Sequence, residues 1–284
     1  MKKIMSLVIA GMILLVGCGN ASDNSSQNAQ PDNSSNQQAE PANKLEKIKA
    51  SGKLVVGTCA DYPPYEFHMM IDGKDEVVGF DIEIAKEIGK ALGVEVEIQD
   101  MGFDAVLAGV GSGLIDIGMA GINPSKDREA AMDFSEMYYQ TVHTILVRAD
   151  AKDNYKSVDD LAGKTIGAQI GTVQEQISKE TIKGANVKSL GKVTDLVLEL
   201  KTGMIEAIVL EEPVANSYAK QNPDLAVGDS IKMEKIDGGA AVITANDEKE
   251  LMAEINKILA ELKESGKIEQ FVAEANALAE KATE

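Results

Sequence analysis

The stretch GFDIEIAKEIGKALGVEVEIQ, Gly79 to Gln99, combines a helical pattern with a strand pattern and decides the class of fold. Asp81 is the predicted N-cap of the helix, and Gly93 ends it. Apolar residues three and four positions apart share one helical face, which here holds Ile84, Ala85, Ile88 and Leu92. The alternating VEVEIQ that follows is typical of a strand, so the helix should pack its apolar face against a sheet.

The same alternation of strands and helices continues along the chain. Strand patterns occur in KLVVGT (53–58), LIDIGMAG (114–121), KTIGAQ (164–169) and AIVLEE (207–212). Helical patterns occur in FDAVLAGVGSG (103–113), near Val173–Thr181, near Thr194–Lys201 and in Glu250–Leu262. Alternation of this kind predicts an α/β fold with largely parallel sheets.

Two segments echo one another. SGLIDIGMAG (Ser112–Gly121) and TGMIEAIVLE (Thr202–Glu211) both follow the order small residue, Gly, apolar residue, Ile, acid, then strand. The echo is either a chance similarity of two βα units or the mark of two similar lobes. In open α/β sheets ligands bind beyond the carboxyl ends of the strands. Four loops qualify here: Cys59–Tyr65, Ala120–Arg128, Gln169–Gln174 and Glu211–Pro213.

Arg128 stands in an unusual place for an arginine. Ser125 reads as the N-cap of a short helix, which puts Arg128 in a first turn that favours acidic residues. A ligand carboxylate would suit both the arginine and the exposed N–H groups, and Glu211 would suit an ammonium group. Together these needs describe the main-chain end of a free amino acid. The alternative is a surface arginine paired with Glu129 or Asp133.

Composition excludes several classes of function. The chain has 284 residues and a formal charge of -18, so it offers no basic stripe for a nucleic-acid partner. Its two histidines and two cysteines are too far apart to predict a metal cluster or a disulfide framework. We therefore expect no metal and no cofactor. Cys59 reads as a small packing residue.

The N-terminus predicts export. MKK is a positive n-region, Ile4–Val16 is a short apolar h-region, and residues 1–18 end in LVGC, which resembles the lipobox of bacterial lipoproteins. Cys18 would then be acylated (palmitate) and anchored in the lipid bilayer; an ordinary signal peptide is the alternative. Residues 19–43 hold no large apolar side chain and predict a disordered polar tether. The tether favours a Gram-positive cell surface.

Five motifs in order resemble family 3 of the extracytoplasmic solute-binding proteins, which serve polar amino acid ABC transporters. They are GTCADYPPYEF, GFDIEIAKEIGKALG, AGINPSKDREAAMDFSEMYY, LAGKTIGAQIGT and AIVLEEPVA, within Leu45 to about Val272. The resemblance implies the type II periplasmic-binding-protein fold, with two α/β lobes, a cleft between them and two crossing strands. Lobe 1 would span 44–139 and 238–284, and lobe 2 would span 144–236.

The family pattern also implies roles for residues around the ligand's main-chain end. Arg128 would bind the α-carboxylate, with added donors from Thr172 and Val173. Gly121 would offer its carbonyl to the α-ammonium, helped by Asn123. Glu211 stands where relatives usually place an aspartate for the same ammonium, so the carboxylate is one methylene further from its backbone.

Other residues are implied at the side-chain end of the ligand. Tyr62 and Phe103 match positions where relatives sandwich the ligand side chain between rings. Asp61 and Gln169 lie near the end that sets specificity. Two aromatic rings and Asp61 favour a polar or basic amino acid over an aliphatic one.

The resemblance favours a monomeric binding protein without catalytic residues, which captures an amino acid and delivers it to a membrane permease. An exported dehydratase-like enzyme on the same fold is the alternative, and it needs a general acid, for which only Glu211, Asp61 or Glu66 could serve. A sensory input domain is a third possibility, which would need a transmembrane helix beyond the binding region.

Overall fold

The computed structural model describes residues 42–228 and 237–282, which belong to a compact unit spanning Glu40–Glu284. The predicted signal peptide, Cys18 and residues 19–41 of the predicted tether lie outside the described residues. Asn43, at the end of that segment, caps helix α1 (Lys44–Ser51) by accepting a hydrogen bond from the Glu46 N–H at 2.9 Å. None of the described helices has the length and apolar character needed to cross a membrane.

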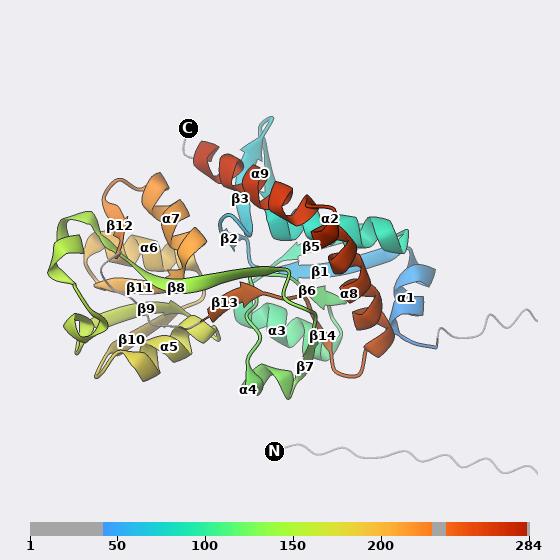
Figure 1. Ribbon diagram of the computed structural model, residues 1–284, viewed down its shortest axis with the longest axis horizontal. Coiled ribbons are helices and arrows are strands. Elements are labelled where there is room, and N and C mark those ends of the chain that lie inside the picture. The colour runs from blue at the N-terminus through green and yellow to red at the C-terminus, as the bar shows by residue number, and fades with distance from the viewer. Residues whose placement is uncertain (1–41, 229–236, 283–284) are drawn as a thin grey trace, which may run out of the picture. The chain divides into compact units, whose positions relative to one another are not determined.

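The first of two main sheets has the strand order β5-β1-β6-β14-β7 (Figure 1). Its strands are β1 (Lys53–Thr58), β5 (Glu95–Asp100), β6 (Ile117–Gly118), β7 (Met132–Phe134) and β14 (Ile243–Ala245). Strand β1 pairs in parallel with β5 and β6, whereas β14 runs antiparallel to β6 and β7. The helices that accompany this sheet are α1 (Lys44–Ser51), α2 (Phe80–Leu92), α3 (Phe103–Ser112), α4 (Lys126–Glu129), α8 (Lys249–Glu264) and α9 (Lys267–Lys281). A small antiparallel sheet joins them: β2 (Asp61–Tyr62), β3 (Glu66–Ile71) and β4 (Lys74–Val78).

The second main sheet has the order β10-β9-β11-β8-β12. Its strands are β8 (Tyr139–Arg148), β9 (Thr165–Gln169), β10 (Asn186–Leu190), β11 (Ala207–Glu211) and β12 (Leu225–Val227). Its helices are α5 (Val173–Thr181), α6 (Val193–Thr202) and α7 (Glu212–Gln221), with 3-10 turns at Ala149–Asn154 and Val158–Leu161. Both faces of this sheet are covered, because Ile145 and Val147 pack in one apolar cluster and Leu146 packs in another. A sheet covered on both faces explains the near-continuous apolar runs in the sequence.

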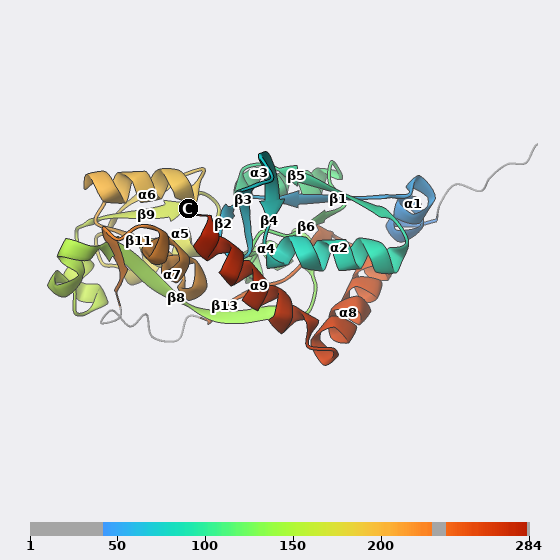
Figure 2. The ribbon, with the colours of Figure 1, turned by 90° about the horizontal axis from the view of Figure 1, so that it is seen from above.

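Strand β8 passes from one lobe into the other (Figures 1 and 2). Its first residues, Tyr139 to Val142, pair with β13 (Asp237–Ala240), and its later residues pair with β11 and β12 of the second sheet. The chain therefore forms two α/β lobes with β8 and β13 as the two crossing strands. Helix α9 of the first lobe also reaches α7 of the second, where Lys220 and Glu280 form an ion pair at 2.6 Å.

The helix of the opening stretch forms as predicted, but its N-cap prediction was wrong. Gly93 ends α2 in the left-handed conformation, whereas Gly79, not Asp81, is the N-cap. Gly79 has a φ of 131°, and a Cβ added there would lie 2.0 Å from the Tyr65 carbonyl oxygen. This close approach starts the helix at Phe80 and puts Asp81 inside the first turn. The buried Asp81 carboxylate accepts a hydrogen bond from the Gly121 N–H at 3.0 Å.

We expect Gly79→Ala to destabilise the protein by at least about 3 kcal/mol, because it combines a glycine-only backbone conformation with a clash against backbone. Urea unfolding measures the loss. The matched control is Gly111→Ala in α3, where an added Cβ meets no atom within 4 Å. That change should be neutral or stabilise by about 0.5–1 kcal/mol. Equal unfolding midpoints for the two variants would contradict the prediction.

The sequence echo is a structural repeat. In the first lobe the Asp116 carboxylate accepts a hydrogen bond from the Val55 N–H at 2.8 Å. In the second, the Glu206 carboxylate accepts one from the Thr165 N–H at 2.9 Å. The isoleucine before each acid is buried: Ile115 and Ile205. The reading of two similar lobes is therefore confirmed, although the predicted strand at 114–121 shortens to β6, because its first residues form the turn that positions Asp116.

Candidate functional site

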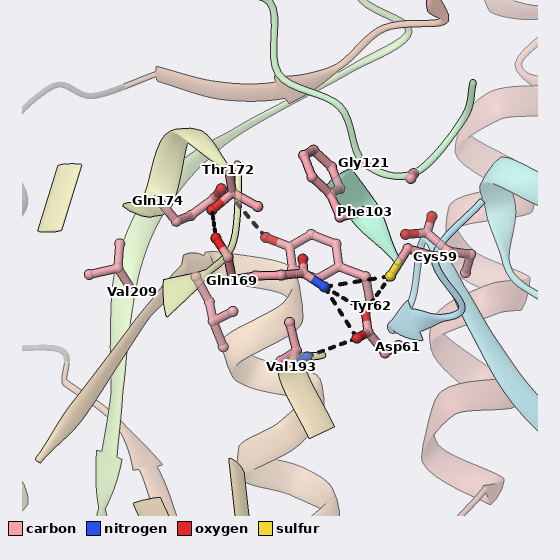
Figure 3. A pocket seen from close by; sticks show the side chains of 13 residues that line it. Cys59, Asp61, Tyr62, Phe103, Gly121, Gln169, Thr172, Gln174, Val193 and Val209 are labelled. Atoms are coloured by element: carbon pink, nitrogen blue, oxygen red, sulfur yellow. Dashed lines mark hydrogen bonds between the residues drawn. The ribbon is translucent and has the colours of Figure 1, made fainter. Parts of the chain in front are cut away.

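A cavity lies between the lobes, beside the carboxyl ends of β1 and β9, where an open α/β sheet is expected to bind its ligand. Figure 3 shows its wall from close by. Side chains from both lobes line it: Cys59, Asp61, Tyr62, Glu66, Phe103, Ala120, Gly121, Gln169, Thr172, Gln174, Val193, Val209 and Leu210. Six predicted site residues are among them, namely Asp61, Tyr62, Phe103, Gly121, Gln169 and Thr172. Asn123, Arg128, Val173 and Glu211 are not.

Tyr62 and Phe103 give the cavity two aromatic walls, and both are buried. Gly121 has a φ of 54°, and a Cβ added there would lie 3.0 Å from the Tyr62 ring, so a side chain at 121 would crowd the cavity. The Tyr62 hydroxyl accepts hydrogen bonds from Gln174 Nε2 and from the Glu211 N–H, each at 3.3 Å. These bonds tie the ring of the first lobe to two elements of the second.

Asp61 is a buried carboxylate that faces the cavity from the first lobe. Its side chain accepts hydrogen bonds from the Val193 N–H at 2.8 Å and from Gln169 Nε2 at 3.3 Å. Burial raises the pKa of Asp61 to about 6, and these hydrogen bonds oppose the rise. The neighbouring Cys59 is buried, and burial followed by the Asp61 charge raises the pKa of its thiol. A thiol with a raised pKa is a poor nucleophile, which agrees with a packing role.

Glu66 is a cavity residue that the sequence reasoning considered only as a general acid. It is fully buried, and neither of its carboxylate oxygens has a hydrogen-bond partner within the described residues if the group is ionised. Burial and then the negative charge of Asp81 hold its pKa well above the ordinary range. Two ionised carboxylates cannot donate to each other, so a proton on Glu66 is what allows it to bond Asp81. The cavity wall thus carries a buried carboxyl whose ionised form would have no compensating charge among the described residues.

Arg128 bridges the two lobes at the edge of the cavity. Its Nη1 donates to the Asn123 carbonyl at 2.8 Å, and its Nη2 donates to the Gly171 carbonyl of the second lobe at 2.7 Å. The guanidinium carbon lies 5.4 Å from the centre of the Phe103 ring. Burial lowers the pKa of Arg128 to about 10. Within the described residues its hydrogen-bond acceptors are these two carbonyls and no carboxylate pairs with it, so the predicted alternative of a surface pair with Glu129 or Asp133 does not form.

Helix α5 begins at the cavity, as the sequence predicts. Thr172 is its N-cap and accepts a hydrogen bond from the Glu175 N–H at 3.2 Å. Val173, the first helical residue, is half-buried outside the cavity wall. Gln174, which the sequence reasoning missed, donates to the Tyr62 hydroxyl and lies 3.2 Å from His143 Nε2. Its position in the first turn of a helix that begins at a predicted ligand-binding loop is the signal by which the sequence could have identified it.

Glu211 lies beside the crossing strands, and both of its carboxylate oxygens accept hydrogen bonds. Its Oε1 accepts hydrogen bonds from Asn123 Nδ2 at 2.6 Å and from the Gly239 N–H at 3.0 Å, and its Oε2 accepts one from the Tyr65 hydroxyl. Burial raises the pKa of Glu211 to about 7, while the three donors lower it. Because Glu211 is fully buried, contact with a ligand ammonium requires neighbouring groups to move aside, and that contact stays a prediction.

We expect the ligand-free protein to become more stable as pH falls from about 8 to about 5.5. A carboxyl whose folded pKa is raised binds a proton more tightly when folded, so its stability contribution is lost as pH rises through the folded pKa. This window is set by Asp61 and Asp81 at about 6 and Glu211 at about 7. Below about pH 4.5, carboxyls with lowered pKa values, such as Glu87 and Glu175, reverse the trend.

Calorimetric melting temperatures across this pH range measure the effect. Glu211→Gln, which cannot titrate, should show a shallower pH dependence than the wild type. A wild-type melting temperature that rises steadily from pH 5.5 to 8 would contradict the assignment of raised pKa values to these three groups.

The sequence model of a protein family, the bacterial extracellular solute-binding proteins, family 3, matches residues 54–275 of this chain. The chain belongs to this family. This solute-binding protein is 34% identical over 275 residues to the arginine-binding extracellular protein ArtP of Bacillus subtilis. The alignment covers 95% of this chain and 96% of ArtP. It is 29% identical over 225 residues to the L-cystine-binding protein TcyJ of Escherichia coli, across 79% of this chain and 83% of TcyJ.

Solved structures agree with the two-lobe description. The amino acid ABC transporter substrate-binding protein AbpA of Streptococcus pneumoniae, bound to L-arginine, is 40% identical with a TM-score of 0.80, covering 82% of this chain and 98% of that one. The ancestral amino acid-binding protein AncCDT-1, a precursor of cyclohexadienyl dehydratase, is 31% identical with a TM-score of 0.72, covering 86% and 100%. This solute-binding protein therefore has the type II periplasmic-binding-protein fold.

The comparisons also decide between the function classes. The family match and the relatives identify the chain as an extracytoplasmic amino-acid-binding protein of the ABC transporter type, and not as an enzyme. AncCDT-1, the precursor of a dehydratase, is itself described as an amino acid-binding protein, so this likeness does not favour the dehydratase alternative.

Proposed function

We propose that this solute-binding protein captures free L-arginine, or a closely related cationic amino acid, between its lobes and delivers it to a membrane permease. The observation that carries the proposal is Glu66, a buried carboxyl with no compensating charge in the wall of a cavity. The ionised form of such a buried acid is costly without a cation, so a cationic ligand is the partner that would let Glu66 ionise. A relative named for arginine and a structure bound to L-arginine support the same ligand.

The proposed pose places the main-chain end of the ligand beside Arg128 and the start of α5. Arg128 would exchange its carbonyl partners for the α-carboxylate, a better acceptor because it is charged. Thr172 and Val173, at the positive end of α5, would add donors. Gly121 would accept from the α-ammonium through its carbonyl, and the Glu211–Asn123 pair would form the negative side of that pocket.

The side-chain end of the ligand would lie between the aromatic walls. Tyr62 and Phe103, which line the cavity, would present their rings to a planar guanidinium or to its methylene stem. Beyond them Glu66 would lose its proton and pair with the ligand cation, with Asp61 and Gln169 alongside. A neutral side chain of the same length would form no ion pair with Glu66 and would gain nothing from its ionisation.

We further propose the organisation that delivery requires. Acylation of Cys18 would anchor a monomer in the lipid bilayer of a Gram-positive cell, with residues 19–43 as the tether. Lobe 1 would span 44–139 and 238–284, and lobe 2 would span 144–236. The motifs at the N-terminus and the change of sheet along β8 support this division.

A thermal-shift screen of the twenty amino acids, with L-citrulline added as the neutral analogue of L-arginine, tests the proposed ligand. Binding to the folded state alone raises stability by RT ln(1 + [L]/Kd), so the tightest ligand gives the largest shift. L-arginine should give the largest shift and L-citrulline a small one, and mass spectrometry should recover the arginine unchanged. A larger shift with a neutral amino acid would overturn the proposed ligand, and consumption of arginine would favour the enzyme.

A further inference from the structure

Helix α6 of the second lobe begins without a cap of its own. Its N-cap residue, Lys192, makes no side-chain cap hydrogen bond, and the first N–H group of the helix, at Val193, donates to the Asp61 carboxylate at 2.8 Å. The first turn of a helix carries unpaired N–H groups and partial positive charge, so a carboxylate there is stabilising. The group that satisfies the start of α6 is therefore not local to it.

Asp61 belongs to β2, in the first lobe, and three elements of the second lobe hold it. Val193 opens α6, Gln169 at the end of β9 donates from Nε2 at 3.3 Å, and the Tyr218 hydroxyl of α7 donates to the Asp61 carbonyl at 2.7 Å. Figure 3 shows Asp61 between Gln169 and Val193. Its exposed fraction is 4%, so water does not replace these donors while the lobes are together.

We propose that Asp61 is the latch of the closed cleft: its carboxylate completes helix α6 only when the two lobes are together, and so controls how fast bound ligand escapes. The proposal rests on the proposed function only in that ligand is held between the closed lobes. Asp61 acts here as a positioning residue, through the backbone of the opposite lobe.

Loss of the Asp61–Val193 hydrogen bond should speed the opening of the cleft, and with it ligand dissociation, rather than change how fast ligand binds. In the open cleft water hydrates both the carboxylate and the start of α6, so neither group is left unsatisfied. In the closed cleft the two satisfy each other across the lobes, and opening must break a hydrogen bond to a charged group. A contact made only after closing changes the dissociation rate far more than the association rate.

A pair of substitutions at Val193 tests the latch without touching Asp61. Val193→Pro removes the N–H donor, and proline is well tolerated at the first position of a helix. Lys192 has φ -126° and ψ 141°, which suits a residue before proline. Val193→Ala is the matched control, because it loses comparable packing of this buried side chain and keeps the N–H.

Stopped-flow kinetics with L-arginine on the full chain provide the measurement. Val193→Pro should raise the dissociation rate by about 10- to 100-fold, the value of one hydrogen bond to a charged group. Asp61→Ala should raise it at least as much, because it also loses the bond from Gln169 and the carboxylate beside the ligand. Val193→Ala should raise it much less, and the association rate should stay within a few-fold in both Val193 variants. Because the two changes remove the same bond, the double variant Asp61→Ala/Val193→Pro should dissociate no faster than the faster single variant.

Two results would overturn the latch: equal dissociation rates for Val193→Pro and Val193→Ala, or multiplied effects in the double variant. If the wild type does not bind L-arginine, the proposed ligand fails, and the same kinetics are then measured with the amino acid that gives the largest thermal shift. The latch predicts the same order of dissociation rates for that ligand, and equal rates for Val193→Pro and Val193→Ala would refute it.

Discussion

Arg128→Ala is expected to weaken L-arginine binding by roughly 10²- to 10³-fold, the equivalent of about 3–5 kcal/mol for a desolvated charge that loses its partner. Arg128 is the cation beside the cavity that forms no ion pair within the described residues, and its present acceptors are two backbone carbonyls. A ligand carboxylate would replace these neutral acceptors with a charged one. Titration calorimetry measures the loss of affinity.

The controls for Arg128 separate its charge from its geometry. Arg128→Lys keeps the charge but not the planar fork, so it should recover only part of the affinity. Lys126→Ala, in the same helical turn but exposed, should bind as the wild type does. The ligand-free melting temperature of Arg128→Ala should fall little, since it loses two hydrogen bonds to carbonyls that water can reach after truncation. Normal arginine affinity in Arg128→Ala would rule out its contact with the carboxylate.

Glu66→Gln is expected to reduce affinity for L-arginine by about 10- to 100-fold while it leaves affinity for L-citrulline nearly unchanged. The substitution keeps the shape of the side chain and removes its ability to become negative. Burial and then the negative charge of Asp81 raise the pKa of Glu66, which favours its protonated form in the ligand-free protein. The stability of the ligand-free variant should therefore stay close to that of the wild type. The loss of affinity should then be specific to a cationic ligand.

Proton release gives a second readout for Glu66. If arginine displaces the Glu66 proton, binding at neutral pH releases about one proton per ligand, and the measured enthalpy depends on the ionisation enthalpy of the buffer. Glu66→Gln should remove most of this buffer dependence. The same buffer dependence in the variant and the wild type would assign the proton to another group, and equal losses for arginine and citrulline would move the cation site away from Glu66.

The elements that the sequence predicts well are those whose signals are local. Helix α5 forms at Val173–Thr181 as predicted, because its Thr172 cap and apolar spacing lie within a single segment. The N-cap of α2 was mispredicted because a long-range contact decides it: Gly79 is forced against the Tyr65 carbonyl, and Asp81 is drawn to the Gly121 N–H. The preference of aspartate for the N-cap position is weaker than these long-range contacts, which decide the start of the helix.

The candidate site divides in the same way. The family motifs point to Tyr62, Phe103 and Arg128, and the structure brings all three to one cavity edge. The environment of Glu66 is invisible in the sequence, because its burial and its neighbour Asp81 arise from packing of β3 against α2. The engagement of Glu211 by Asn123 and the Gly239 N–H likewise depends on elements far apart in the chain.

The repeated acid of the two lobes has a mechanical consequence. Asp116 and Glu206 each clamp a turn to the first part of a neighbouring strand, so each sheet is stiffened at the end opposite the cleft. We therefore expect the lobes to rotate about the joint where β8 pairs with β13. Two stiff lobes connected at such a joint convert a small displacement at the ligand into a rotation of a whole lobe. The distance that a surface point travels should therefore grow in proportion to its distance from that joint.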